Sequence, residues 1–275
     1  MSLFLDQCIH KKEMTFLTTG HKSGLGRYLF EQFGGIGLDR NMPSQKFEHI
    51  SREGVDVIIH CASQPPRALT LTSLYQFTDD NVLLTERISR IRHKKFIFIS
   101  SVDVYPKNSS LHNEKKDIPL DSTTNLYAIT KLMSESIIMK KCTNYLILRC
   151  SALLGTYSRQ NSLTKMAEEK NPVLTLTASS VMNYILHRQV ADFIKYAIEN
   201  NLSGVYNLAS SQNITLARVA NLLKKKVNFG SYSYSVGKIS NRKISKIFSS
   251  FARTSEEIVE QFIKEDLIKR RALTS

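Results

Sequence analysis

The sequence of 275 residues contains no tryptophan and no long uninterrupted apolar run. A membrane-spanning helix needs about 20 apolar residues, so no membrane partner is expected. The first apolar stretch is short, contains Asp6 and lacks a basic start, which argues against a signal peptide. These absences predict a soluble, cytoplasmic protein.

Cysteine is also scarce, with single residues at Cys8, Cys61, Cys142 and Cys150. They form no CxxC pair, and no Cys/His cluster has the spacing of a metal site, so no metal is expected. We interpret the four residues as reduced or buried thiols, which agrees with a reducing compartment.

Acidic residues are few, because 24 Asp and Glu face 38 Lys and Arg, which gives a formal charge of +14. We interpret this excess as a solvated basic surface, with the steering of an anionic substrate as the alternative. No zinc finger, RNA-binding signature or basic tail accompanies the charge, so no nucleic-acid partner is expected.

The chain does contain alternating apolar runs and helical patterns, which predict an α/β fold with a Rossmann-like, doubly wound parallel sheet. Strands are predicted at 14–18, 35–38, 55–60, 96–100, 145–149 and 204–209. Helices are predicted at 25–33, 79–92, 127–140, 190–200 and 215–226, and Ser255 is the expected cap of a last helix. A doubly wound sheet would fit another strand and helix before Val55, so these are abbreviated or missing.

The segment from Thr19 to Gly26 reads TGHKSGLG and lies between the first predicted strand and helix. Glycines let such a turn approach a pyrophosphate closely, and the helix N-terminus supplies free N–H groups. This position predicts a dinucleotide-binding loop. Its candidate binding residues are Gly20, His21, Ser23, Gly24, Leu25 and Gly26.

Asp39 ends the second predicted strand, where a carboxylate can bind the adenosine ribose. Its negative charge favours NAD, because it repels the 2′-phosphate of NADP. Arg40 and Lys22 favour NADP for the opposite reason. The expected cofactor is therefore NAD or NADP.

Tyr127 and Lys131 lie four positions apart in a predicted helix, so their side chains share one face. A tyrosine with a pKa near 10 is a poor base, and a nearby ammonium lowers that pKa. The preceding predicted strand ends at Ser100 and Ser101, and ligands bind beyond such strand ends. A hydroxyl there can bind the substrate oxygen whose proton Tyr127 exchanges.

Taken together, these segments resemble the extended short-chain dehydrogenase/reductase family, the nucleotide-sugar-modifying NAD-dependent epimerases and dehydratases. The matching stretches, in family order, are TGHKSGLG, DVIIHCAS, DNVLLTE, FIFISSVDVYP, NLYAITKLMSESII, LILRCSALLG and GVYNLASSQNITLARVA. The resemblance implies a catalytic triad of Ser101, Tyr127 and Lys131, in which Lys131 lowers the pKa of Tyr127 and holds the nicotinamide ribose.

The resemblance also implies further contacts. Cys61, Ala62 and Ser63 would lie along the cofactor, and Asn81 is either structural or cofactor-supporting. The family's architecture implies a nucleotide-binding domain of residues 1–150 plus about 185–209. Residues 151–184 and 210–275 would form a small C-terminal substrate-binding subdomain. A homodimer through the helices 79–92 and 127–140 is also a family expectation.

The residues after Ser101 depart from the family pattern. Asp103 matches the glutamate of the sugar-nucleotide dehydratases, but Val102 replaces the acid before it. A 4,6-dehydratase is therefore not favoured. We expect Asp103 to cap its loop, with a role as a second acid or base as the alternative.

The segment from Val181 to Ala191 departs as well. Met182 stands where an arginine for the substrate diphosphate is frequent, and Gln189 stands where an aspartate is usual. We expect His187 and Arg188 to be surface residues, with compensation for the missing arginine as the alternative.

The sequence thus predicts an NAD(P)-dependent epimerase or keto-reductase that acts by hydride transfer on a sugar. The small-molecule partner expected from the resemblance is a nucleotide sugar. The rival from another class is a cofactor-binding sensor without turnover. Such proteins often lose the tyrosine or lysine, and this chain has both.

Overall fold

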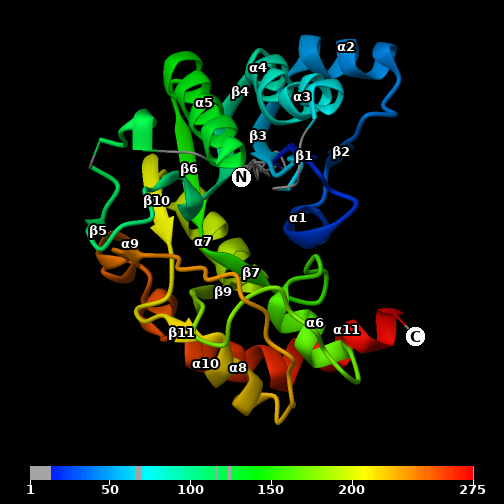
Figure 1. Ribbon diagram of the computed structural model, residues 1–275. Coiled ribbons are helices and arrows are strands. Elements are labelled where there is room, and N and C mark those ends of the chain that lie inside the picture. Colours follow the sequence, from blue (N-terminus) through cyan, green and yellow to red (C-terminus); the bar gives the residue numbers. More distant parts are fainter. Residues whose placement is uncertain (1–13, 66–69, 116, 123–124, 275) are drawn as a thin grey trace, which may run out of the picture.

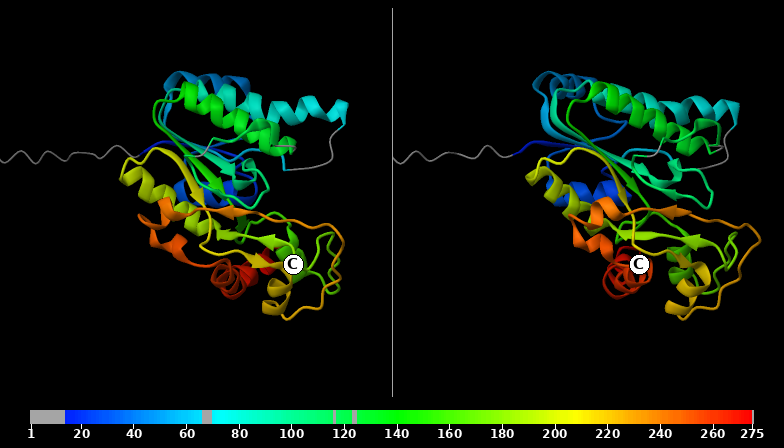
Figure 2. Two further views of the ribbon diagram at one scale, coloured as in Figure 1. Left: turned by 60° about the vertical axis from the view of Figure 1, so that its left-hand side comes forward. Right: turned by 90° about the vertical axis from the view of Figure 1, so that its left-hand side faces the viewer.

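The computed structural model describes residues 14–65, 70–115, 117–122 and 125–274. Asp6 and Cys8 lie outside these residues. Figures 1 and 2 show a central sheet between two layers of helices, with smaller elements packed below it beside the C-terminus. None of the helices formed by the described residues has the length and apolar character needed to cross a membrane.

The sheet has six parallel strands in the order β10-β6-β4-β3-β1-β2. They are β1 (Phe16–Thr19), β2 (Ile36–Leu38), β3 (Val55–His60), β4 (His93–Ser101), β6 (Tyr145–Cys150) and β10 (Gly204–Leu208). This confirms the predicted Rossmann-like parallel sheet. The strand order reverses around β1, and the carboxyl ends of the strands at such a reversal form a crevice for ligands.

Both faces of the sheet are buried because successive side chains of a strand point to opposite sides. Val57 and Ile59 join the apolar cluster that holds the helices α1 (Gly24–Phe33) and α7 (His187–Glu199). Ile58, between them, joins the cluster on the other face. The helices covering that face are α2 (Ser44–Glu53), α4 (Leu84–Ser89) and α5 (Leu126–Lys141). The uninterrupted apolar strands of the sequence follow from this double coverage.

The segment between β2 and Val55, all of which the structure describes, contains the helix α2 but no strand. β3 pairs directly with β1, on the side opposite to β2. Of the strand and helix that a longer sheet would contain there, only the helix is present.

The helix predicted at 79–92 begins earlier than expected. α3 (Leu71–Thr78) continues through a π-helical turn at Asp79–Leu83 into α4. Thr70 caps its start in a reciprocal pair with Ser73. The first two turns escaped the prediction because they are rich in threonine and aromatic residues, which have low helix propensity.

A second group of elements lies below the sheet (Figure 1). Its parts are β7 (Ala152–Leu154), α6 (Ser162–Glu168), β8 (Val181–Met182), β9 (Tyr184–Leu186), β11 (Ile214–Thr215), α8 (Leu216–Leu222), α10 (Ser255–Gln261) and α11 (Leu267–Thr274). These elements share an apolar cluster that includes Leu163, Leu216 and Ile258. Two short pieces, β5 (Leu111–His112) and β12 (Lys238–Ile239), pair with each other, and α9 (Arg242–Ser245) follows β12.

The last amphipathic helix is present, but its expected cap is wrong. Thr254 occupies the N-cap of α10 and forms a capping box with Glu257. Ser255 is instead buried, and its hydroxyl accepts a hydrogen bond from the backbone N–H of Tyr184 at 3.1 Å. Ser255 therefore joins α10 to β9, a contact between segments far apart in the sequence.

Candidate active site

Two adjoining cavities lie at the carboxyl edge of the sheet. The tyrosine cavity, of about 480 Å³, is lined by Tyr127 and extends to the start of α1. The aspartate cavity, of about 760 Å³, is lined by Asp39 and by the residues after β2. Both are lined by Gly20, Ser23, Ser63 and Arg159, so the glycine loop lies where the two cavities meet.

The glycine loop has the geometry that its sequence predicts. Gly20 has a φ of +69°, which favours glycine, and a Cβ built on it would lie 3.0 Å from the backbone nitrogen of Ala62. A Cβ on Gly26 would lie only 2.3 Å from the carbonyl oxygen of Gly20. The first turn of α1 therefore packs directly against the turn that precedes it, with its N–H groups at the cavity junction.

The remaining predicted loop residues divide between the two cavities. Gly24 and Leu25 line the tyrosine cavity, His21 lines the aspartate cavity, and Ser23 lines both. The His21 ring packs on β2, since a Cβ on Gly37 would lie 2.5 Å from it.

Asp39 is held as a carboxylate at the end of β2. Hydrogen bonds from the Lys22 ammonium and from the backbone N–H of Asn41 (2.7 Å) hold its pKa below the usual value. Arg40 forms an ion pair with Asp80. Each of the two cations that favour NADP in the sequence is therefore paired with a carboxylate.

The loop after β3 is positioned by Thr19. Its hydroxyl accepts hydrogen bonds from the backbone N–H groups of Cys61 (3.1 Å) and Ala62 (3.0 Å), and it also bonds to the ring of His60. Cys61 faces the tyrosine cavity and Ala62 the aspartate cavity. Burial raises the pKa of the Cys61 thiol to about 12, which makes this cysteine a poor nucleophile.

Asn81 lines neither cavity. Its amide accepts from the backbone N–H of Gln64 at 2.6 Å and donates to the carbonyl of Gln64 and to the hydroxyl of Thr130. These contacts fix the loop after β3 against α5, and they support the structural alternative for Asn81.

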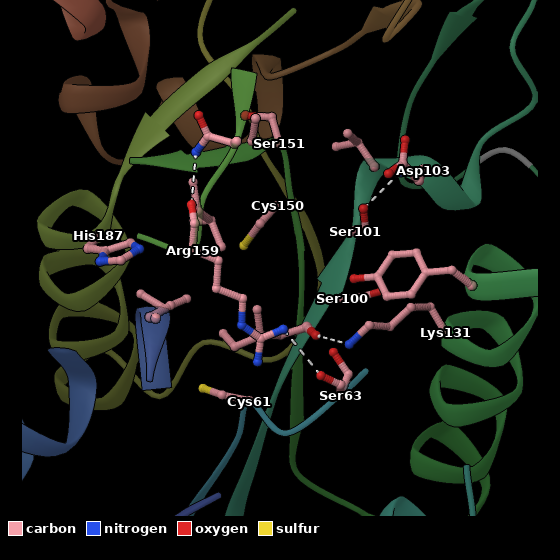
Figure 3. A pocket seen from close by; sticks show the side chains of 18 of the residues that line it. Cys61, Ser63, Ser100, Ser101, Asp103, Lys131, Cys150, Ser151, Arg159 and His187 are labelled. Atoms are coloured by element: carbon pink, nitrogen blue, oxygen red, sulfur yellow. Dashed lines mark hydrogen bonds between the residues drawn. The ribbon is translucent and has the colours of Figure 1, made fainter. Parts of the chain in front are cut away.

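Ser101, Tyr127 and Lys131 all line the tyrosine cavity (Figure 3). The side chain of Asn125 caps α5 by accepting from the N–H of Tyr127 at 2.9 Å. The Lys131 ammonium is buried, lies 5.7 Å from the centre of the Tyr127 ring, and donates to the carbonyl of Ile99 at 2.8 Å. The structure thus brings together three residues that the sequence places on two separate elements.

Burial controls the charge state of this group. It lowers the pKa of Lys131 to about 8. It also raises the pKa of Tyr127 above the ordinary value, and the negative charge of Asp103 acts in the same direction. A hydrogen bond with Ser63 and the charge of Arg159 oppose this shift without reversing it. The expectation of a lowered Tyr127 pKa is therefore wrong for the chain by itself, because desolvation dominates.

The two serines at the end of β4 have different partners. The Ser101 hydroxyl accepts from the backbone N–H of Asp103 at 3.1 Å, whereas the Ser100 hydroxyl donates to Glu135 at 2.5 Å. Glu135 forms a buried ion pair with Arg149, which also donates to the hydroxyl of Tyr105. Both serines line the tyrosine cavity, as their place at the strand end predicts. The Ser100 hydroxyl, however, belongs to a polar network that braces β4 and β6 against α5.

Asp103 was expected to cap its own loop, but among the described residues its carboxylate has other partners. Its carboxylate accepts hydrogen bonds from the Lys107 ammonium (2.6 Å) and from the hydroxyl of Tyr234 (3.0 Å). Tyr234 is held at both sides, because its N–H donates to the Ser180 hydroxyl and its carbonyl accepts from the N–H of Val181. Asp103 therefore cross-links the end of β4 to the segment that covers the tyrosine cavity.

The expectation that His187 is a surface residue is also wrong. It is 2% exposed and lines the tyrosine cavity, and burial lowers its pKa to about 3. A Cβ on Gly155 would lie 2.6 Å from its Nδ1, so the ring packs closely on that glycine. Arg188, its neighbour, pairs with Glu265, and Gln189 bonds to the backbone of Leu186.

Several further residues of the cavities were not identified from the sequence. Ser151, Asn183, Tyr234 and Val236 line the tyrosine cavity, and Arg159 lines both cavities. They come from irregular segments after β6, where the sequence has no periodic pattern. The single available signal is the position of Ser151 directly after the strand β6, at the carboxyl edge of the sheet.

The fold and the cavity residues define a class: a Rossmann-like α/β protein with a glycine-rich phosphate loop and a Ser-Tyr-Lys cluster. Residues 15–209 match the model of the NAD dependent epimerase/dehydratase family. The chain belongs to this family of NAD(P)-dependent epimerases, dehydratases and reductases. Its structural neighbours include enzymes that modify nucleotide sugars.

Solved structures of the family share the whole architecture. The dTDP-4-dehydrorhamnose reductase of Yersinia enterocolitica is 21% identical, with a TM-score of 0.75 over 94% of this chain and 99% of that one. The UDP-glucuronic acid 4-epimerase of Bacillus cereus, solved with UDP-glucuronic acid and NAD, is 17% identical, with a TM-score of 0.73 over 94% and 100%. At these identities the likeness shows the fold.

A curated relative is the dTDP-D-glucose 4,6-dehydratase of Dictyostelium discoideum. It is 21% identical over 222 aligned positions, and the alignment covers 72% of this chain and 50% of the relative. The dehydratase of Bos taurus is 22% identical over 182 aligned positions, and the alignment covers 61% of this chain and 51% of that protein. The chain thus matches about half the length of these curated relatives.

Proposed function

We propose that this chain is an NAD-dependent epimerase or keto-reductase that acts on the sugar of a nucleotide sugar. One observation carries the proposal: Ser101, Tyr127 and Lys131 line the same cavity as the glycine loop. Membership in the family and the nucleotide sugars bound by solved relatives support it. A bound nicotinamide would accept a hydride from a sugar carbon or return it there.

The chain's own residues supply binding and proton transfer. Tyr127 exchanges the proton of the sugar hydroxyl or carbonyl, and Ser101 donates a hydrogen bond to the same oxygen. The Lys131 ammonium donates to the Ile99 carbonyl in the structure, and it would hold the nicotinamide ribose of a bound cofactor and favour the phenolate of Tyr127. The residues at the start of α1 would hold the pyrophosphate of a bound cofactor, because the close approach of Gly20 and Gly26 leaves no room for side chains there.

The cavity does not favour a dehydratase. A dehydratase needs a second acid or base beside the tyrosine, and Asp103 is the carboxylate nearest to that role. The Asp103 carboxylate is already engaged by Lys107 and by Tyr234. We therefore favour oxidation and reduction at one carbon over elimination of water.

NAD is the proposed cofactor because of the ion pairs around Asp39. Lys22 and Arg40 are paired with Asp39 and Asp80, so neither is free for a 2′-phosphate. The Asp39 carboxylate can accept hydrogen bonds from a ribose and repels a phosphate. Asp39→Ser should shift the ratio of the NADH and NADPH dissociation constants toward NADPH, and an unchanged ratio would contradict the assignment.

Identification of the bound cofactor tests the proposal directly. The purified protein is denatured, and any nicotinamide that it releases is identified by mass spectrometry. Tightly held NAD supports an epimerase, and freely exchanging NADH supports a reductase. Turnover is then measured with UDP-hexoses and with dTDP-4-keto sugars. Failure to bind any nicotinamide dinucleotide would refute the proposed function.

The rival function is a sensor that binds the cofactor without turnover. The presence of both Tyr127 and Lys131 in one cavity favours the enzyme. The sensor becomes the better description if NADH binds tightly while no sugar nucleotide is converted and Tyr127→Phe leaves the binding unchanged.

We also propose a homodimer through the helices of one face. α4 and α5 pack side by side. α5 exposes Met133 and Met139, and Leu83 is exposed in the π-helical turn before α4. These apolar side chains would be covered by the same helices of a second copy. Light scattering should give twice the chain mass for the wild type, and Met133→Asp should give the mass of one chain.

A further inference from the structure

Arg159 lies at the junction of the two cavities and has no acidic partner among the described residues. Its guanidinium donates a long hydrogen bond, from Nη1 to the carbonyl of Ser63 at 3.4 Å. In Figure 3 its side chain reaches across the tyrosine cavity between Cys61 and Lys131. An arginine in this position is available for an anion.

The backbone that carries Arg159 is fixed on the glycine-loop side. The guanidinium of Arg27 lies over the ring of Tyr157, 4.1 Å from its centre, and the Tyr157 hydroxyl is hydrogen-bonded to Glu31. Arg27 and Glu31 both belong to α1. A Cβ built on Gly24 would lie 3.8 Å from both Cγ and Nε of Arg159. The side chain therefore runs along the first residue of α1.

The other side of this loop is fixed by the C-terminal elements. Arg270 donates to the carbonyl of Ser158, and Asn161 caps α6 while its amide donates to the carbonyl of Arg159. Arg159 is an exposed residue, whereas the backbone around it is held on both sides. The backbone of this loop is therefore fixed, while the Arg159 side chain can change conformation to meet an anion.

The charges around Arg159 also call for an anion. Burial is the main cause that lowers the pKa of Lys131, and the positive charge of Arg159 acts in the same direction. The two cations thus repel each other in the absence of a counterion. A pyrophosphate at the start of α1 would lie between the N–H groups of the helix and this guanidinium, which can bind phosphate oxygens in a bidentate way.

We propose that Arg159 binds the cofactor's pyrophosphate from the side opposite to the glycine loop, and so holds the dinucleotide between the sheet and the substrate-side elements. This inference rests on the proposed cofactor binding. It assigns to the irregular loop after β7 a second phosphate contact that the glycine motif does not contain.

The test compares dinucleotide affinities of four proteins. Wild type, Arg159→Gln, Arg159→Lys and the matched surface control Arg218→Gln are titrated with NADH, by its fluorescence, and with ADP-ribose, by calorimetry. ADP-ribose keeps the pyrophosphate and lacks the nicotinamide. Arg218 is an exposed arginine paired with Glu256 on α10 and lines neither cavity.

Arg159→Gln should raise the dissociation constants of NADH and ADP-ribose by about ten-fold, the usual effect of losing a charged hydrogen bond. It should also reduce the salt dependence of binding, while Arg159→Lys keeps most of the affinity and Arg218→Gln keeps all of it. Thermal unfolding should be unchanged in each variant.

Wild-type affinities in Arg159→Gln would overturn the inference and leave the proposed function intact. A rise restricted to the KM of a nucleotide sugar would overturn it as well, because the anion would then belong to the substrate. If the wild type binds neither NADH nor ADP-ribose, both the inference and the proposed function are overturned.

Discussion

The two sides of the tyrosine cavity are built in different ways. The cofactor side consists of Gly20, Gly26 and their neighbours, which are contiguous in sequence and fixed by backbone packing. The substrate side combines Asp103, Arg159 and Tyr234, which come from three distant segments and line the same cavity; Asp103 and Tyr234 are joined by a side-chain hydrogen bond. The first arrangement leaves a motif in the sequence, whereas the second leaves isolated residues.

The difference explains why one side is readable and the other is not. A backbone loop at a helix start binds any dinucleotide pyrophosphate, so its glycines serve the same purpose throughout such folds. Side chains on irregular segments adapt to one particular substrate, and their pattern has no fixed spacing. The same comparison yields predictions of decreasing expected effect.

The largest effect is expected from Tyr127→Phe, at the boundary of the two sides. Loss of a positioned proton donor and acceptor should lower kcat by a factor of about 100 to 10,000. The dissociation constant of NADH should stay near the wild-type value. The matched control is Tyr232→Phe, at a residue that is 67% exposed, and this variant should keep full turnover. Full activity of Tyr127→Phe would remove this residue from the mechanism.

Gly26→Ala should damage the cofactor side through its backbone. The added Cβ would lie 2.3 Å from the Gly20 carbonyl, so the turn must shift, at a cost of about 1–3 kcal/mol in the free energy of unfolding. NADH affinity should fall together with stability.

Ser151→Ala is the corresponding change on the substrate side. The Ser151 hydroxyl is buried without a hydrogen-bond partner in the described part of the chain, so its removal should leave the free energy of unfolding nearly unchanged. Chemical denaturation of both variants checks the pair. Equal destabilisation by the two substitutions would contradict the contrast between the two sides.

Asp103→Asn should shift the pH profile of sugar oxidation toward lower pH. The negative charge of Asp103 raises the pKa of Tyr127, after the larger effect of burial, because it disfavours the phenolate. Its removal lowers that pKa, so the rise of kcat with pH should occur earlier. Asp117→Asn, an exposed substitution, should leave the profile in place.

Tyr234→Phe separates the charge of Asp103 from its cross-link. The variant keeps the carboxylate and loses the 3.0 Å hydrogen bond to it. We expect an unchanged pH profile and a higher KM for the sugar nucleotide. An acid shift in Tyr234→Phe as large as that in Asp103→Asn would show that the cross-link, and not the charge, controls Tyr127.

The smallest effect concerns stability in acid. Burial depresses the pKa of His187 from 6.5 to about 3, so the unfolded chain takes up a proton below pH 6.5 that the folded chain refuses. Stability from this group is therefore complete above pH 6.5 and is lost as the pH falls toward 3. His187→Phe should reduce the slope there by up to about 1.4 kcal/mol per pH unit.

An exposed histidine provides the comparison for this slope. His49→Gln should leave the dependence of unfolding on pH as it is in the wild type, because His49 is in solvent. His60 has a similarly depressed pKa and remains in both variants, so part of the acid sensitivity should persist. An unchanged slope in His187→Phe would mean that the ring is hydrated in solution.

The sequence by itself determined the parallel sheet, its six strands and the position of the glycine loop. Apolar runs such as the one at Val55–His60 predict strands buried on both faces, since a solvated face would require alternation. Tyr127, Lys131 and Ser101 were also found from the sequence, because helix spacing and strand ends are local properties. The cap of α10 and the start of α3 were misplaced because local signals compete there.

Only the tertiary structure decided what faces the cavity from afar. It placed Arg159 across the glycine loop, joined Tyr234 to Asp103 and buried His187. It also set the charge state of Tyr127, for which burial outweighs the neighbouring cations. Burial and contacts between distant segments depend on how the whole chain packs, and no local pattern of residue types records them.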